Sequence, residues 1–233
     1  MSEIHRLWSE ALKRGAKPGT DVDAEEHHLH GWVDVLDSWG TGKPYSGMAC
    51  IDQKWLDAHP VLWSSAMKIE IGGGRTPRGE GFVNVDILPC ADVVIDLELG
   101  RLPFPSDSVD AAYTSHCLEH VNNAVGVLGE LLRVCKIGAP VEIRVPHWLH
   151  PMACCSGHVH VLSDRQVEIW CNQPENFWPE SPKRFALKGI HYQIDVAHHE
   201  LRPLFPALTD EQVAKYIPGC CHEIRCSLEV VAR

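Results

Sequence analysis

The sequence contains no long apolar stretch: no segment approaches the roughly 18 uninterrupted apolar residues that a membrane-spanning helix requires. It also lacks any run of five or more Lys and Arg, and its 21 basic and 31 acidic residues give a net charge of −10. Because a nucleic-acid backbone is bound by clustered positive charge, we expect neither a membrane nor nucleic acid as a partner.

We expect no secretory leader, because the first residues mix charges of both signs with isolated apolar positions. The ten cysteines are too sparse for a small disulfide-bonded scaffold, so we expect free thiols and a cytoplasmic location. The 15 histidines are more notable, because their protonation near pH of about 6.5 would reduce the acidic charge.

The length and the change in composition along the chain predict one principal core with an addition. With 233 residues, one α/β domain is favoured over two independent ones. Residues 1–65 are rich in Trp, His and Gly, and we expect them to form a helical and irregular appendage, with a helix at 2–14, that packs on the core or acts as a lid. Residues 66–233 should form the main domain.

Short β-rich runs begin at residue 67 and predict a largely parallel sheet. They are MKIEI, FVNVD, DVVID, DAAYTS and VEIRVP. A helical pattern at 121–136 lies between two of them, which predicts a right-handed βαβ unit that ends near Gly138. Only seven residues, Arg75 to Gly81, precede the second run, so we expect the first crossover helix to be vestigial. Later segments predict helices at 163–170 and 208–217, and strands at 189–199 and 223–233.

The strongest local motif is a glycine-rich turn after the first predicted strand. Glu70 and Ile71 are followed by Gly72, Gly73 and Gly74, and Asp86 ends the second run twelve residues later. Glycines allow a backbone to approach a ligand closely, and an acid at the next strand end can accept the hydroxyl groups of a ribose. The same residues could also form only a structural turn and its cap.

Further motifs follow in a fixed order. They are Asp96-Leu97, Leu102-Pro103-Phe104-Pro105, Ser108-Val109-Asp110 and Ser115-His116-Cys117-Leu118-Glu119-His120. Taken together over about residues 68–146, they resemble the class I S-adenosylmethionine (SAM)-dependent methyltransferases, especially the group called methyltransferase type eleven. The resemblance implies an α/β fold with a Rossmann-like, three-layer arrangement, whose sheet is mostly parallel with an antiparallel C-terminal strand. It also implies SAM as cofactor and S-adenosylhomocysteine as product.

The resemblance assigns roles to individual residues. Glu70 and the three glycines match the loop around the methionine part of SAM, and Asp86 matches the acid that binds the ribose. Ile87, Asp96 and Leu97 match the positions beside the adenine, while Ser115 and His116 match the end of the fourth strand near the sulfonium. A nicotinamide-dinucleotide site is the nearest competitor, but its fingerprint needs a small residue where this chain has Pro77.

Three histidines are candidates for acid–base catalysis: His116, His147 and His150. They lie near predicted strand ends, where open α/β sheets bind ligands. Methyl transfer from a sulfonium is a direct displacement, so a base is needed only if the acceptor must lose a proton. Each histidine could equally be a packing residue.

Clusters of Cys and His raise the question of a metal. Residues 147–160 are dense in potential ligands, and Cys220, Cys221, His222 and Cys226 add more. Zinc binds such side chains, but no pair of clean Cys-x-x-Cys clips is present. We therefore assign no metal ligand, and zinc stays open without being favoured.

The sequence as a whole predicts an enzyme that transfers the SAM methyl group to an O, N or C acceptor, most simply on a small molecule. Residues at about 147–200 should shape the acceptor site. Methylation of a protein or peptide side chain is one alternative. A subunit that binds SAM or its product without catalysis is another, and a homodimer also stays open.

Overall fold

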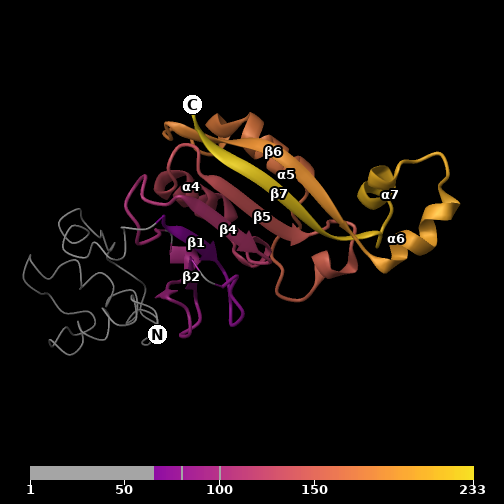
Figure 1. The fold of residues 1–233 in the computed structure, drawn as a ribbon, viewed down its shortest axis with the longest axis horizontal. Coiled ribbons are helices and arrows are strands. Elements are labelled where there is room, and N and C mark those ends of the chain that lie inside the picture. Colours follow the sequence, from indigo (N-terminus) through magenta and orange to yellow (C-terminus); the bar gives the residue numbers. More distant parts are fainter. Residues whose placement is uncertain (1–65, 80, 100) are drawn as a thin grey trace, which may run out of the picture.

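A computed structural model describes residues 66–79, 81–99 and 101–233. The predicted appendage at 1–65, with its helix at 2–14, lies outside the described residues. The described part contains one seven-stranded sheet with helices packed against it (Figure 1). Among the described residues, no helix is both long enough and apolar enough to cross a membrane.

The sheet has the strand order β3-β2-β1-β4-β5-β7-β6. Its strands are β1 (Lys68–Ile71), β2 (Phe82–Asp86), β3 (Val93–Val94), β4 (Ala111–Ser115), β5 (Pro140–Pro146), β6 (Lys183–Ile194) and β7 (Cys221–Ala232). The first five strands pair in parallel, while β7 runs antiparallel to both β5 and β6. The predicted mostly parallel α/β sheet with an antiparallel C-terminal strand is therefore confirmed.

Within the described residues, four α-helices and five short 3-10 helices connect the strands. The α-helices are α4 (Ala124–Val134), α5 (Asp164–Asn172), α6 (Val196–Leu201) and α7 (Asp210–Tyr216). The 3-10 helices are η2 (Leu97–Leu99), η3 (Leu118–His120), η4 (Pro151–Cys154), η5 (Pro174–Asn176) and η6 (Arg202–Leu204). Side-chain caps fix several of the starts: the Asn123 side chain accepts from the backbone N–H of Gly126 at 2.9 Å, and Thr209 forms a capping box with Gln212.

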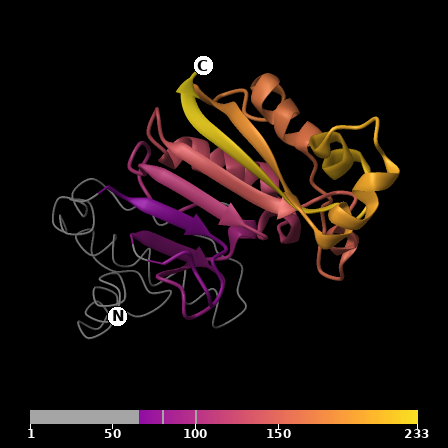
Figure 2. The ribbon, with the colours of Figure 1, turned by 45° about the vertical axis from the view of Figure 1, so that its right-hand side comes forward.

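The two faces of the sheet differ in chemistry. Along β5, buried Val141, Ile143 and Val145 alternate with the half-buried Glu142 and Arg144. The apolar face packs against α4 and α5, which lie on the same side of the sheet (Figure 2). The opposite face is polar, and there the Arg144 guanidinium lies 5.2 Å from the centre of the Tyr113 ring. The described residues thus supply two of the three predicted layers.

Most predicted elements are present, with one clear error. As expected, the described residues between β1 and β2 form no helix. The strand predicted at 189–199 is right only as far as Ile194, because the Asp195 side chain caps the helix α6 that begins at Val196. The strand itself begins earlier than predicted, at Lys183.

The strand order determines where a ligand can bind. From β1 the chain continues outward through β2 and β3, and then returns to β4 on the other side of β1. A crevice is expected at such a reversal, outside the carboxyl ends of the parallel strands. The segments after β1, β2 and β4 therefore meet at one edge of the sheet.

Candidate cofactor site

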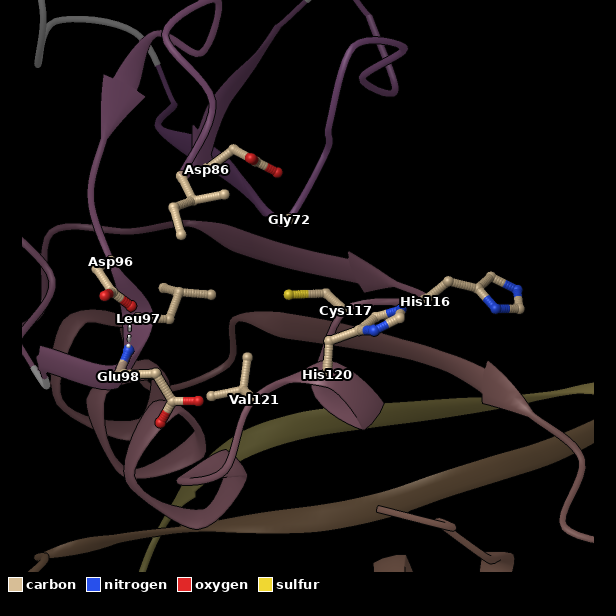
Figure 3. Close-up of a pocket in the computed structure, with 10 residues that line it drawn as sticks. Gly72, Asp86, Asp96, Leu97, Glu98, His116, Cys117, His120 and Val121 are labelled. Carbon is tan, nitrogen blue, oxygen red and sulfur yellow. Dashed lines mark hydrogen bonds between the residues drawn. The ribbon is translucent and has the colours of Figure 1, made fainter. Parts of the chain in front are cut away.

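A cavity of about 420 Å³ lies at this reversal point. Its size falls within the usual range of roughly 300–1,000 Å³ for small-molecule sites. Ten residues line it: Gly72, Asp86, Ile87, Asp96, Leu97, Glu98, His116, Cys117, His120 and Val121. Figure 3 shows Asp86 and the Asp96–Glu98 segment toward one end, and the histidines toward the other.

The glycine turn packs directly on the segment after β4. Gly72 has a φ of +73°, and a Cβ atom there would lie 2.3 Å from the Cys117 Sγ atom, so no side chain fits without displacement. The backbone N–H of Gly73 donates to Asn84 Oδ1 at 3.1 Å, which ties the turn to β2. The turn is therefore held close to both neighbouring strands, and its backbone forms part of the cavity wall.

Asp86 is fixed by the backbone around it. One carboxylate oxygen accepts from the N–H of Gly74 at 2.8 Å, and the other accepts from the N–H of Leu88 at 2.9 Å. The residue is 7% exposed and lines the cavity. Because a carboxylate offers about four lone-pair sites, each oxygen can accept a further hydrogen bond from a ligand hydroxyl.

The part of the cavity wall formed by Ile87, Leu97 and Glu98 combines apolar and acidic side chains. Ile87 is 44% exposed, unusually for its type, and lines the cavity together with Leu97. Glu98 holds the wall in place, because its Oε1 accepts from both the backbone N–H and the side-chain amide of Asn122, at 2.6 and 2.9 Å. Three acidic residues on the lining, Asp86, Asp96 and Glu98, favour a ligand that carries positive charge.

His116 occupies a special position at the end of β4. Its φ of +51° lies in the left-handed region, which non-glycine residues adopt rarely. Its Nδ1 lies 3.3 Å from Glu119 Oε1 and its Nε2 lies 3.0 Å from Glu223 Oε2. These two carboxylates, Glu119 foremost, raise the pKa of His116 to about 9. The ring is therefore cationic at neutral pH, a state in which it cannot accept a proton.

The structure brings six of the ten predicted cofactor residues to the cavity lining. They are Gly72, Asp86, Ile87, Asp96, Leu97 and His116. The other four, Glu70, Gly73, Gly74 and Ser115, are not part of the lining but lie within two positions of Gly72 or His116 in the sequence. Glu70 is buried and accepts from the backbone N–H of Arg78 at 2.5 Å, and burial raises its pKa.

The two other predicted catalytic histidines do not line the cavity. His147 is fully buried and stacks on Trp148, with ring centres 3.9 Å apart, and burial lowers its pKa to about 4. His150 Nε2 lies 3.6 Å from Asp195 Oδ2. Their catalytic roles stay predictions, and within the described residues only His116 of the three lies at the cavity.

Sequence reasoning missed four lining residues: Glu98, Cys117, His120 and Val121. Three of them belong to or directly follow the motif Ser115-His116-Cys117-Leu118-Glu119-His120, whose last four members were given no role. The motif in the sequence could therefore have identified these three residues as part of the site. The short helix η3 turns the chain back at Leu118, so that residues on both sides of the turn face the same space.

Comparison with known proteins agrees with this geometry. Residues 81–141, which include β2, Asp86 and the histidine motif, match the family described as "Methyltransferase domain". The match covers part of the chain, and the resemblance predicted from the order of the motifs is thereby confirmed.

The individual proteins to which this chain is similar are distant from it in sequence. An uncharacterised methyltransferase of Mycobacterium leprae is 23% identical over 180 residues, which are 65% of this chain and 66% of the relative. The chain thus matches just under two thirds of that relative's length. A solved SAM-dependent methyltransferase from Archaeoglobus fulgidus has a TM-score of 0.48 at 14% identity, over 76% of this chain and 91% of the other. The YcgJ protein from Bacillus subtilis has a TM-score of 0.45 at 11% identity, over 77% of this chain and 97% of the other.

Proposed function

We propose that the cavity binds SAM and that the protein transfers its methyl group to a small-molecule acceptor. The observation that carries the proposal is the convergence of Gly72, Asp86, Asp96 and Leu97 on one cavity at the reversal point of the sheet. These residues come from three separate segments, each of which the motifs had assigned to the cofactor.

The chemistry of the lining fits the parts of SAM. The Asp86 carboxylate would accept the ribose hydroxyls, and Ile87 with Leu97 would pack against the adenine. The acidic side chains would stabilise the positive charge of the sulfonium and amino groups. The methionine end would then extend past Gly72 toward Cys117 and His120, which places the methyl group near the histidine end.

The reaction needs little beyond alignment. A lone pair of the acceptor attacks the methyl carbon, the carbon–sulfur bond breaks, and its electron pair stays on the sulfur of S-adenosylhomocysteine. Holding the two reactants in line can supply most of the rate. A cytoplasmic location is part of the proposal, because a reducing compartment would keep the nine described cysteines as free thiols.

Calorimetric titration with SAM and with S-adenosylhomocysteine tests the proposal. We expect saturable binding to the wild type and a loss of about 10- to 100-fold in affinity for Asp86→Asn, because a hydrogen bond to a charged group contributes about 1.5–3 kcal/mol. Glu180→Gln, a change at an exposed acid, is the matched control and should bind like the wild type. Absence of binding by the wild type would contradict the proposal.

Turnover is measured separately, as S-adenosylhomocysteine formed with panels of small molecules and of peptides. Product with small molecules supports the proposed acceptor class. Product only with peptides would favour the side-chain alternative, and tight binding with no turnover in either panel would favour a binding subunit.

A further inference from the structure

A buried carboxylate beside the cavity has few partners for its charge. Glu119 is 1% exposed, and within the described residues no hydrogen-bond donor is aligned with either of its carboxylate oxygens. The only ion pair found for it in the described part of the chain is the 3.3 Å approach of His116 Nδ1 to Oε1. A buried ionised carboxylate costs several kcal/mol unless it is paired and hydrogen-bonded or coordinates a metal.

Two histidines lie near this carboxylate, and each has one ring nitrogen within hydrogen-bond distance of a backbone carbonyl oxygen. His120 Nδ1 lies 3.0 Å from the carbonyl oxygen of Gly157, and His158 Nδ1 lies 3.3 Å from that of Ala153. A carbonyl can only accept, so each Nδ1 carries the proton and each Nε2 keeps a free lone pair. Metal-bound histidines are held in this way, with one ring nitrogen donating to a carbonyl or carboxylate.

The three side chains come from two distant segments that the backbone joins. The carbonyl oxygen of Glu119 accepts from the N–H groups of Val159 and His160, at 2.8 and 3.2 Å. The rings of His120 and His158 meet edge to face, with centres 4.6 Å apart. One potential ligand atom from each of Glu119, His120 and His158 lies within 4.8 Å of the other two.

We propose that Glu119, His120 and His158 bind one divalent metal ion of the zinc type at the wall of the cavity. Two imidazoles and a carboxylate are a ligand set that catalytic zinc sites use, with a fourth position left for water or substrate. Imidazole ligands favour zinc over magnesium or calcium, which prefer oxygen. This site does not depend on the proposed methyl transfer.

The position of His120 gives the ion a role. Because His120 lines the cavity, the open coordination position faces it, at the end away from Asp86 and Asp96. A hydroxyl oxygen of an acceptor would bind there, and the metal would lower its pKa so that the proton passes to solvent. The oxygen then bonds to the methyl carbon as the carbon–sulfur bond breaks. This second part rests on the proposed function and identifies the acceptor class as hydroxyl compounds.

Zinc titration of the full-length, chelator-treated protein tests the site, in competition with a chelator that outcompetes weak surface ligands. We expect the wild type to bind one equivalent of zinc tightly. His158→Ala and Glu119→Gln should each weaken it by at least about 100-fold, beyond the 10- to 100-fold typical of an outer-shell partner.

His160→Ala is the matched control. It changes the same residue type in the same segment, but its Nε2 already bonds to the carbonyl oxygen of Asn122 at 2.9 Å, so it should keep the tight equivalent. Equal zinc affinity in the wild type, His158→Ala and Glu119→Gln would overturn the site, and would mean that protonated His116 alone balances Glu119.

SAM titration of the same proteins separates this proposal from the proposed function. SAM binding without a tight zinc equivalent overturns the metal site only, and a tight zinc equivalent without SAM binding overturns only the methyl-transfer function.

A separate experiment tests whether the open coordination position is accessible. Co²⁺ replaces zinc in the protein, and acetohydroxamate serves as an oxygen-donor probe. A change in the visible Co²⁺ spectrum supports an accessible position, and an unchanged spectrum overturns it.

Discussion

The two ends of the cavity are built in different ways. At the glycine end, backbone groups fix the geometry: Asp86 is held by the N–H groups of Gly74 and Leu88, within a short stretch of chain. At the histidine end, side chains from distant segments meet, and within the described residues the Glu119 carboxylate, unlike that of Asp86, accepts no backbone hydrogen bond. The difference suggests that the first end tolerates little change in shape, whereas the second responds to charge, protons and metal ions.

The largest expected effect comes from filling the glycine end. Gly72→Ala places a Cβ 2.3 Å from Cys117 Sγ at a φ of +73°, so the turn must move away from β4. We expect SAM affinity to fall by more than about 100-fold, equivalent to over ~2.7 kcal/mol. Gly74→Ala is the matched control, since its φ is +59° but a Cβ there meets nothing within 4 Å. Calorimetry that shows equal losses in the two variants would contradict the close-packing argument.

A buried histidine outside the cavity lining, His147, should make stability depend on pH. Burial lowers the pKa of His147 to about 4 from 6.5, so the folded protein keeps it neutral while the unfolded chain takes up a proton. Stability is therefore lost as pH falls from about 6.5 toward 4, by roughly 2 kcal/mol between pH 7 and 5. Urea unfolding of the wild type and of His147→Gln measures this. Identical pH slopes in the two proteins would show that His147 does not carry the effect.

The smallest effect on SAM affinity is expected at Glu98, whose hydrogen bonds connect the two ends of the cavity. Glu98 lines the cavity and accepts two hydrogen bonds from Asn122, just beyond His120 and Val121. Glu98→Ala removes this tie on an exposed surface, and we expect SAM affinity to fall by about 5-fold, in line with hydrogen bonds of ~1 kcal/mol. Calorimetry at 25 °C measures it. A loss as large as that of Gly72→Ala would show that the ends are not mechanically separate.

The glycine end could be predicted from sequence because its determinants are local. Gly72, Asp86, Asp96 and Leu97 each lie at or just after the end of a strand that its apolar residues identify, and parallel strands bring their carboxyl ends to one edge. The strand predicted at 189–199 failed for a local reason as well, since the capping role of Asp195 was not recognised. His147 and His150 were candidates only because they follow a strand, and strand-end position does not reveal that the cavity lies elsewhere.

The sequence by itself determined the strands of the sheet and the order of its motifs, because hydrophobic alternation and turn chemistry act over a few neighbouring residues. The candidate cofactor residues came from the resemblance that those motifs carry. Only the tertiary structure decided that His158 lies beside Glu119 and His120. That contact depends on how the segment after β5 folds back, where backbone hydrogen bonds from Val159 and His160 reach Glu119. It also decided the opposite protonation of two histidines, because a pKa depends on burial and on charges that come from distant parts of the chain.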